Sequence, residues 1–580
     1  MAKKPVKYSV VDAFTDKAFK GNPAAVCLLE DPREEEWLQA VATEFNLSET
    51  CYLTPISDAE SLSGTPRFGL RWFTPVAEVE LCGHATLAAS YFLFSNELVK
   101  SDKIEFLTQS GVLTAKKFPE NRTSNPVNEP KGNYLIELDF PAVPIAEINS
   151  VDVLEISKSL NGAAVVEVQK TAGDDLFVVL PSAKAVAEVA PQFDEIRRCP
   201  GRGMVITGPA SPESGFDFYS RFFCPKLGIN EDPVTGSLHC SLAVYWSKKL
   251  GKSDFIAYQA SPRGGVINIQ MDEKNERVLL RGKAVVVAEG VILVDAFTGE
   301  AFKGNPALVC SLEDTKDDQW LQAVASELNI PSTAYVTPVS MSPESTIPRF
   351  GIRWFTPVTE VKLCGHATLA ASHFLFSYGI VQSDIIEFSS HSGVLTAKKI
   401  SKTRTSITVN ECHDQDEDFL IELDFPLIPI ADFNSVDISQ ISKSLNGASV
   451  VEVHKTTNGE DLLVVLPSAK AVVEVQPQFD EIKRCPGRAM IITGAALPES
   501  EFDFYSRVFS PKLGIDEDPV TGSVHCALGD YWSKKLGKSD FVAYQASPRG
   551  GVINLHLDEK NERVLLRGKA VIVTEGSILV

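Results

Sequence analysis

The stretch from residue 79 to residue 90 reads VELCGHATLAAS, and the interpretation of the whole chain starts from it. A strand-like segment at 68–73 leads through Thr74 and Pro75 to a Gly-His step, where an apolar helix is expected to begin. The helix continues through FLF at 92–94 and is apolar on all sides, which is typical of a helix buried in a domain. Its start presents unpaired backbone N–H groups and the positive end of the helix dipole, and His84 lies at that start.

The same stretch returns at residues 361–372, with His366 in the place of His84. Residues 67–95 match 349–377 at 25 of 29 positions, and 247–287 match 533–573 at 36 of 41. A repeat this long is not a solenoid unit, so each copy should be a complete folding unit. We predict copy one at 1–290, with subdomains at about 1–120 and 130–275 and a last strand that returns to the first, and copy two at 291–580, with subdomains at about 291–402 and 415–560.

The composition excludes several classes of function. The hydrophobic fraction of 44% and the charged fraction of 23% are those of a globular protein, and the formal charge of −21 argues against nucleic-acid and anionic-membrane partners. No run approaches the roughly 18 apolar residues of a membrane span, and the first residues lack the apolar core of a secretory signal, so we expect a cytoplasmic protein. The eleven cysteines form no CxxC pair and no Cys/His cluster, so we expect no metal site.

The join between the copies has no linker. The end of copy one, EGVILV at 289–294, matches the end of copy two, EGSILV at 575–580, yet VDAF at 294–297 also matches the opening VDAF at 11–14. We therefore predict that 291–294 form one buried strand that ends one copy and begins the next. The two copies are expected to form an internal pseudo-dimer that needs no partner chain.

Within each copy, short β-branched runs and turn residues predict many strands and a few helices. In copy one we expect strands at 8–14, 24–29, 51–54, 68–73, 104–106, 112–116, 135–140, 165–169, 176–180, 204–207, 216–223, 255–259, 266–270, 278–280 and 284–287. We expect an amphipathic helix from 31–32, outer helices at 151–160 and 182–197, and a second apolar helix at 238–249 after a Gly-bearing turn. The pattern indicates an α/β (α+β) copy with two halves, each a mostly antiparallel sheet around one apolar helix.

Five motifs cover each copy in a fixed order. In copy one they are DAF at 12–14, GNPAAV at 21–26, SET at 48–50, CGHAT at 82–86 and EDPVTGS at 231–237. Together they resemble the phenazine-biosynthesis PhzF-like isomerase family. The resemblance implies a diaminopimelate-epimerase-like fold whose two pseudo-symmetric halves enclose the active site, and members that are usually homodimers. The best-known member shifts a proton in a dihydro-hydroxyanthranilate without metal or organic cofactor, so we expect no cofactor here.

The resemblance also implies the site residues. Glu49 matches the family's single acid/base, while His84 and Asp232 at the two helix starts would bind substrate and steer protonation. The implied substrate-binding residues are Ser48, Gly83, Gly236 and Ser237. From the residues alone, His84, Asp232 and Ser237 could equally cap helices.

Two other residue types need an interpretation. Epimerase relatives use two cysteines, and Cys82 lies next to where the first would be. The second half offers Asp232 at the matching place, so a two-thiol racemase is disfavoured and Cys82 is interpreted as packing. His239 and His525 fall inside the second apolar helix of each copy and are predicted to be core residues.

Copy two departs from the SET motif, which reads PST at 331–333, so Ser332 stands where copy one has Glu49. A serine with no adjacent base cannot take over the proton transfer near neutral pH. His366, Asp518 and Ser523 remain, so this degenerate site is expected to bind without turnover. We predict a cofactor-independent isomerase that acts on a small carboxylate-bearing substrate. The alternatives are a two-base amino-acid epimerase or racemase, a non-catalytic small-acid-binding protein, and a structural dimer.

Overall fold

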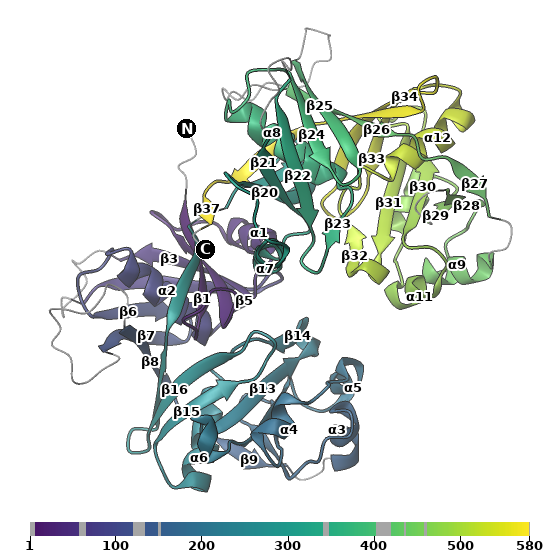
Figure 1. The fold of residues 1–580 in the computed structure, drawn as a ribbon. Helices are drawn as coiled ribbons and strands as arrows, with labels where there is room; N and C mark the ends of the chain where they lie inside the picture. Colours follow the sequence, from purple (N-terminus) through teal and green to yellow (C-terminus); the bar gives the residue numbers. More distant parts are fainter. Residues whose placement is uncertain are drawn as a thin grey trace. The chain divides into compact units, whose positions relative to one another are not determined.

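The computed structural model describes residues 6–56, 65–119, 134–148, 152–289, 291–339, 347–401, 419–433, 437–457 and 461–578. The chain divides into two compact units (Figure 1). Unit 1 comprises Met1–Gly290 together with Ser577–Val580, and unit 2 comprises Val291–Gly576. The chain therefore begins in unit 1, builds unit 2, and returns to unit 1 at its end.

The first half of unit 1 surrounds the helix that starts at Gly83. Its strands are Lys7–Ala13 (β1), Asn22–Leu28 (β2), Glu49–Pro55 (β3), Arg67–Phe73 (β4), Glu78–Val79 (β5), Lys103–Thr108 (β6), Gly111–Pro119 (β7), Tyr134–Pro141 (β8) and Ala284–Glu289 (β18), and its helices are Glu35–Phe45 (α1) and Gly83–Ser95 (α2). The strands pair in the order β18-β1-β2-β3-β4-β6-β7-β8, with β5 beside β4. Only β2–β3 and β4–β6 are parallel among these pairs.

The second half of unit 1 follows the same plan. Its strands are Ile145–Glu147 (β9), Glu167–Thr171 (β10), Leu176–Val179 (β11), Met204–Pro209 (β12), Phe218–Cys224 (β13), Ile229–Asp232 (β14), Asp254–Gln259 (β15), Gly265–Asp272 (β16) and Arg277–Gly282 (β17), and its helices are Val153–Ser159 (α3), Ala183–Ala187 (α4), Phe193–Arg198 (α5), His239–Leu250 (α6) and the short 3₁₀ turns Pro212–Ser214 (η2) and Pro225–Leu227 (η3). The order is β9-β10-β11-β12-β13-β15-β16-β17, with parallel pairs at β11–β12 and β13–β15. Helix α6 thus stands where α2 stands in the first half, and β17 pairs with β8 to join the halves.

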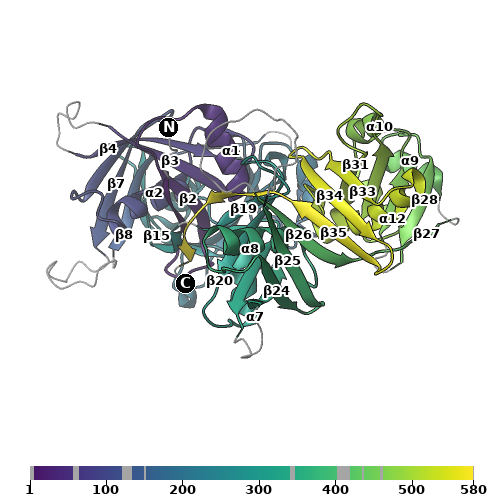
Figure 2. The same cartoon turned by 90° about the horizontal axis from the view of Figure 1, so that it is seen from above.

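Unit 2 repeats unit 1 strand for strand (Figure 2). Its strands are Leu293–Ala296 (β19), Asn305–Ser311 (β20), Thr333–Pro338 (β21), Arg349–Phe355 (β22), Glu360–Val361 (β23), Ile385–Ser390 (β24), Gly393–Ser401 (β25), Phe419–Pro426 (β26), Ile430–Asp432 (β27), Glu452–Thr456 (β28), Leu462–Val465 (β29), Met490–Ala495 (β30), Phe504–Ser510 (β31), Ile515–Asp518 (β32), Asp540–Gln545 (β33), Gly551–Asp558 (β34), Arg563–Gly568 (β35) and Ala570–Thr574 (β36). Its helices are Asp318–Leu328 (α7), Gly365–Ser377 (α8), Ile438–Ser444 (α9), Ala469–Glu474 (α10), Phe479–Arg484 (α11), His525–Leu536 (α12) and the 3₁₀ turn Pro511–Leu513 (η4). Helices α8 and α12 take the places of α2 and α6.

The two apolar helices are buried, as their sequences predict. Eleven of the thirteen residues of α2 are buried, and the helix packs against β1, β2, β3 and β8. Its leucines and phenylalanines share one core with Trp72, Phe106 and Phe140 from the surrounding strands. The predicted fold class, two tandem α+β copies with a central apolar helix in each half, is confirmed. Among the described residues, no helix is both long and apolar enough to span a bilayer.

The outer helix predicted at 182–197 is wrong, because the chain forms two short helices there. Helix α4 ends at Ala187 and α5 begins at Phe193. Pro191 explains the break, since a proline lacks a backbone N–H and disfavours helical geometry in the preceding residue. The other outer helix, predicted at 151–160, is α3, and Val151 lies outside the described residues.

The join differs from the shared strand that the sequence predicts. Val291, Leu293 and Val294 are buried, but in the described part of the chain β19 pairs with β20 and β36, both in unit 2. The matching segment at the end of copy two, Ser577–Ile578 (β37), pairs with β18 of unit 1. The chain thus uses two separate strands at the two places, and 577–580 belong with copy one instead of copy two.

Candidate active site

Glu49 lies at the first position of β3, where parallel pairing with β2 places it opposite Ala24. Its Oε2 lies 2.9 Å from Nε2 of His84, and the two side chains are only 12% and 4% exposed. The two groups form an ion pair when His84 is protonated. The structure thus brings together Glu49 and His84, two of the residues that the family resemblance implies.

Asn22 holds the site together, and sequence reasoning gave it no role. It is fully buried in β2, and its Nδ2 contacts Nδ1 of His84 at 3.0 Å and donates to Oδ1 of Asp232 at 2.8 Å and to the carbonyl of Val234 at 3.0 Å. Ser48 donates through Oγ to Oδ1 of Asn22 at 3.2 Å. One amide therefore joins His84 from the first half to Asp232 from the second. The signal was present, because a Gly-Asn-Pro triplet recurs at 304–306.

Asp232 ends β14 and is fixed from two further sides. Thr235 donates through Oγ1 to Oδ2 of Asp232 at 2.5 Å. The side chain of Gln259 donates to the Asp232 carbonyl and accepts from the Thr235 amide, each at 2.8 Å. Both carboxylate oxygens of Asp232 are thereby occupied, which indicates a positioned group more than a free base.

The two central helices approach each other through glycines. A Cβ built on Gly83 would lie 3.1 Å from Cα of Gly236, so the two backbones approach closely and a larger residue would be crowded there. Gly236 and the half-buried Ser237 lie in the turn before α6, which begins at His239.

The N-termini of α2 and α6 carry no side-chain cap among the described residues. The capping alternative for His84 and Ser237 is therefore not what the structure shows. N–H groups in the first turn of an α-helix lack intrahelical partners, and the dipole of α2 favours an anion at this end.

Burial and neighbouring charges set the protonation of the site. Burial alone lowers the pKa of His84, but the charges of Glu49 and Asp232 outweigh it, and the pKa of His84 lies above its ordinary value. Burial raises the pKa of Asp232, and the charge of Glu49 adds to this against the opposing effect of His84. The site therefore keeps a proton on His84 at pH values where a free imidazole would have lost it.

Cys82 was interpreted as packing, and the structure places it in the site. Its Sγ lies 3.5 Å from Nδ1 of His84. Glu49, Cys82 and His84 could offer one ligand atom each to an ion, because these atoms lie within 4.8 Å of one another. Burial and the charge of Glu49 raise the pKa of the Cys82 thiol well above its ordinary value. The absence of a metal site stays a prediction, because a bound ion would itself favour the thiolate.

The site in unit 2 keeps the scaffold and lacks the carboxylate. Leu308 pairs with Thr333 as Ala25 pairs with Thr50, so Ser332 occupies the position of Glu49. Asn305 contacts Nδ1 of His366 at 3.2 Å and donates to Oδ1 of Asp518 at 2.7 Å.

The glycine contact of unit 2 is also repeated, with slightly more room. A Cβ on Gly365 would lie 3.4 Å from Cα of Gly522 and 3.6 Å from the amide of Ser523. Ser332, His366, Asp518 and Ser523 thus lie at the positions that match Glu49, His84, Asp232 and Ser237.

His239 is a core residue, as predicted. It is fully buried, its Nδ1 contacts the carbonyl of Thr235 at 2.8 Å, and its Nε2 contacts Oγ of Ser220 at 3.2 Å. Burial lowers the pKa of His239 to about 4, so the ring is neutral near pH 7. His525 repeats these contacts with Thr521 and Ser506.

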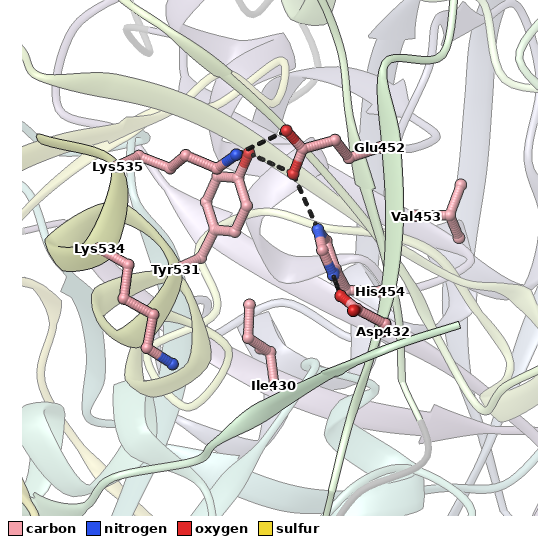
Figure 3. A pocket seen from close by; sticks show the side chains of 8 residues that line it. All are labelled: Ile430, Asp432, Glu452, Val453, His454, Tyr531, Lys534 and Lys535. Atoms are coloured by element: carbon pink, nitrogen blue, oxygen red, sulfur yellow. Dashed lines mark hydrogen bonds and ion pairs between the residues drawn. The ribbon is translucent and has the colours of Figure 1, made fainter. Parts of the chain in front are cut away.

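A cavity of about 530 Å³ lies elsewhere, in the second half of unit 2 (Figure 3). Glu452 is one of its lining residues, accepting from Tyr531 at 3.1 Å and Lys535 at 2.6 Å, and contacting His454 at 2.9 Å. These hydrogen bonds lower the pKa of Glu452 to about 2. Sequence reasoning named no residue here, and its polar groups bind one another.

Comparisons with known proteins agree with the motifs and the geometry. The family model for phenazine biosynthesis-like proteins, PhzC-PhzF, matches residues 11–290 and again 294–576. An uncharacterized isomerase of Halalkalibacterium halodurans is 42% identical over 286 residues, which cover 49% of this chain and 97% of the relative. A human phenazine biosynthesis-like domain-containing protein is 37% identical over 295 residues, covering 49% and 97%.

Solved structures match one copy at a time. A PhzF-family crystal structure from Enterococcus faecalis shows 37% identity with a TM-score of 0.42, and it covers 49% of this chain and 97% of its own. The two family matches together span nearly the whole sequence. The chain belongs to the phenazine biosynthesis-like PhzC-PhzF family and carries two copies of its unit in tandem.

Proposed function

We propose that copy one is a cofactor-independent isomerase that moves a proton on a small carboxylate-bearing substrate. The buried pair of Glu49 and His84 carries this proposal, because it places an acceptor and a donor of protons 2.9 Å apart at an uncapped helix start. Supporting evidence comes from the relatives, several of which are named uncharacterized isomerases, at 39% to 42% identity.

In this mechanism the carboxylate of Glu49 takes a proton from a substrate carbon and returns it to another carbon on the same face. His84, protonated through its raised pKa, stabilises the negative charge that develops in between. Asp232 accepts a hydrogen bond from Asn22, and Asn22 contacts His84, so Asp232 and Asn22 both serve to position the His84 ring. Backbone N–H groups at the start of α2 bind the substrate carboxylate.

Copy two, in the same proposal, binds a related acid without isomerising it. Ser332 offers no group that can accept a carbon-bound proton near neutral pH, while His366, Asp518 and the helix start are retained. The fused copies replace the usual homodimer, so one chain of 63.2 kDa is the functional unit. A mass measurement by light scattering tests this, and clean proteolysis at 288–296 into two stable halves would contradict it.

The reaction class is tested with solvent deuterium. Thermal-shift screening of small cyclic and amino acids first identifies a ligand, and its turnover is then followed in D₂O. A single shielded base moves the substrate's own proton between two carbons, so little deuterium enters the product and no stereocentre is inverted, whereas a two-base epimerase exchanges the Cα proton with solvent and inverts that centre. Binding without any turnover would favour a non-catalytic small-acid-binding protein.

Metal dependence is tested in the same assay. Treatment with a chelator should leave turnover unchanged if Glu49 acts as a free base. Loss of turnover that returns with one added metal ion would instead assign the Glu49–Cys82–His84 group to metal binding.

A further inference from the structure

The site of unit 2 contains a thiol, an imidazole and a hydroxyl in mutual contact. Sγ of Cys364 lies 3.5 Å from Nδ1 and 3.9 Å from Nε2 of His366, and 3.3 Å from Oγ of Ser332. Cys364 is the residue immediately before α8, in extended geometry. A thiol at a helix N-terminus beside an imidazole is the environment in which cysteines become reactive.

The matching cysteine of copy one has a different environment. Cys82 is 5% exposed and lies beside Glu49, and burial together with that charge raises the pKa of its thiol. Cys364 is partly exposed, and Ser332 stands where the glutamate would be. Burial also acts to raise the pKa of Cys364, but the charge of His366 and hydrogen bonds from His366 and Ser332 outweigh it, and the pKa lies below its ordinary value.

The other charged group that faces this cluster is Asp518. Asp518 accepts a hydrogen bond from Asn305, which contacts His366. Burial lowers the pKa of the His366 imidazole, but the charges of Cys364 and Asp518 outweigh burial, and the pKa lies above its ordinary value. Thiolate and imidazolium thus stabilise each other. Ser332 lacks both the carboxylate that is the proposed acid/base of copy one and the negative charge that disfavours a neighbouring thiolate.

We infer that the second site is a thiol site, in which Cys364 adds to small α,β-unsaturated carbonyl compounds with His366 as the proton donor. Sγ forms a bond to the β-carbon, the electrons of the double bond move to the α-carbon, and that carbon takes the imidazolium proton of His366. No oxidant or reductant is needed, and reversal restores thiolate and imidazolium. The positive end of the α8 dipole, next to Cys364, favours the negative charge that develops on the carbonyl or carboxylate oxygen.

This inference does not depend on the proposed isomerase activity of copy one. It is tested on the intact chain with N-ethylmaleimide, an α,β-unsaturated carbonyl compound, at less than one equivalent. Peptide mapping reads each of the eleven cysteines separately as labelling proceeds. At pH 7 Cys364 should be labelled at least roughly tenfold faster than Cys82, and the midpoint of its pH–rate profile should lie below that of an ordinary thiol.

Two reciprocal variants separate thiol activation from exposure alone. Ser332→Glu should slow labelling of Cys364 and move its pH midpoint upward, while Glu49→Ser should speed labelling of Cys82. His366→Gln should also move the Cys364 midpoint upward. Equal rates for Cys82 and Cys364 in the unaltered chain, or a faster Cys364 whose pH midpoint is unaffected by these variants, would overturn the inference.

Discussion

In both copies an asparagine contacts a histidine and an aspartate, but the histidine has different further partners in the two copies. Asn22 and Asn305 contact Nδ1 of His84 and His366 at 3.0 and 3.2 Å, and each donates to the matching aspartate. In copy one the other ring nitrogen faces the carboxylate of Glu49. In copy two Ser332 takes the place of Glu49, and the group whose charge acts most on His366 is Cys364, with Sγ 3.5 Å from Nδ1.

The two proposals together assign different reactive atoms to the two copies. In copy one, burial and the charge of Glu49 raise the pKa of the Cys82 thiol, and the carboxylate is the proposed base. In copy two the thiol lies at the same distance of 3.5 Å from Nδ1 of the histidine, but Ser332 replaces the carboxylate and the pKa of Cys364 lies below its ordinary value. The contacts of asparagine with histidine and aspartate are repeated, whereas Ser48, which donates to Oδ1 of Asn22, is replaced by Pro331.

The largest expected effect comes from removing the carboxylate of copy one. Glu49→Gln should lower kcat by about 10² to 10⁴, which is the usual contribution of a general acid/base, while leaving the Kd of the ligand nearly unchanged. The amide keeps the shape and loses the proton chemistry. Glu188 is exposed at the C-terminal end of α4, and Glu188→Gln is the matched control, which should leave kcat unaltered. Full activity in Glu49→Gln would remove Glu49 from the mechanism.

The reciprocal change should recover part of that loss. Ser332→Glu in the Glu49→Gln background places a carboxylate beside His366, and the asparagine and aspartate contacts around that histidine are already present. We expect turnover above that of Glu49→Gln alone, measured as kcat/KM. If no activity returns, the loops around the second site have diverged as well, and the missing carboxylate is not the sole reason that copy two is inactive.

A smaller effect concerns pH. The pKa of His84 is raised in the folded chain, so its ion pair is fully present below the ordinary histidine pKa of about 6.5 and is lost as pH rises through the raised value. Both kcat/KM and the stability contributed by His84 should therefore fall on the alkaline side, above about pH 6.5.

His84→Gln should remove this alkaline loss of stability, as read from the free energy of unfolding in urea at several pH values. His556→Gln, at a partly exposed position in copy two, is the control and should leave the profile of kcat/KM unchanged. A wild-type profile that stays flat through this range would contradict the Glu49–His84 ion pair.

Sequence alone predicted the tandem copies, the buried helices and the Glu49–Ser332 difference, because each rests on a continuous motif. Asn22 was missed because its partners lie 62 and 210 residues away and meet it only in the folded chain. The contact of Cys82 with His84 was missed because two neighbours at a helix start can turn toward or away from each other. The break at Pro191 was hidden because apolar spacing continues on both sides of it.

The destination of the last strand was also beyond the sequence. The segments at 291–294 and 577–580 are nearly identical, yet the first enters unit 2 and the second pairs with β18 of unit 1. The first is followed by the remainder of a copy, and the second ends the chain. Identical local preferences therefore led to different pairings, which only the long-range sheet order decides.

The smallest expected effect distinguishes the copies by packing. A methyl group on Gly83 would meet the backbone of Gly236 at 3.1 Å, and a backbone contact cannot yield as a flexible side chain can. Gly83→Ala should therefore lower the free energy of unfolding by about 1–3 kcal/mol, as overpacked substitutions do. The methyl group of Gly365→Ala would stand 3.4 Å from Gly522, an ordinary contact, and the lower entropy of the unfolded chain should offset it to within about 1 kcal/mol. Urea unfolding of both variants measures the comparison. Equal losses would mean that the helix starts of the two copies are packed alike, and the difference between the sites would then rest on Glu49 alone.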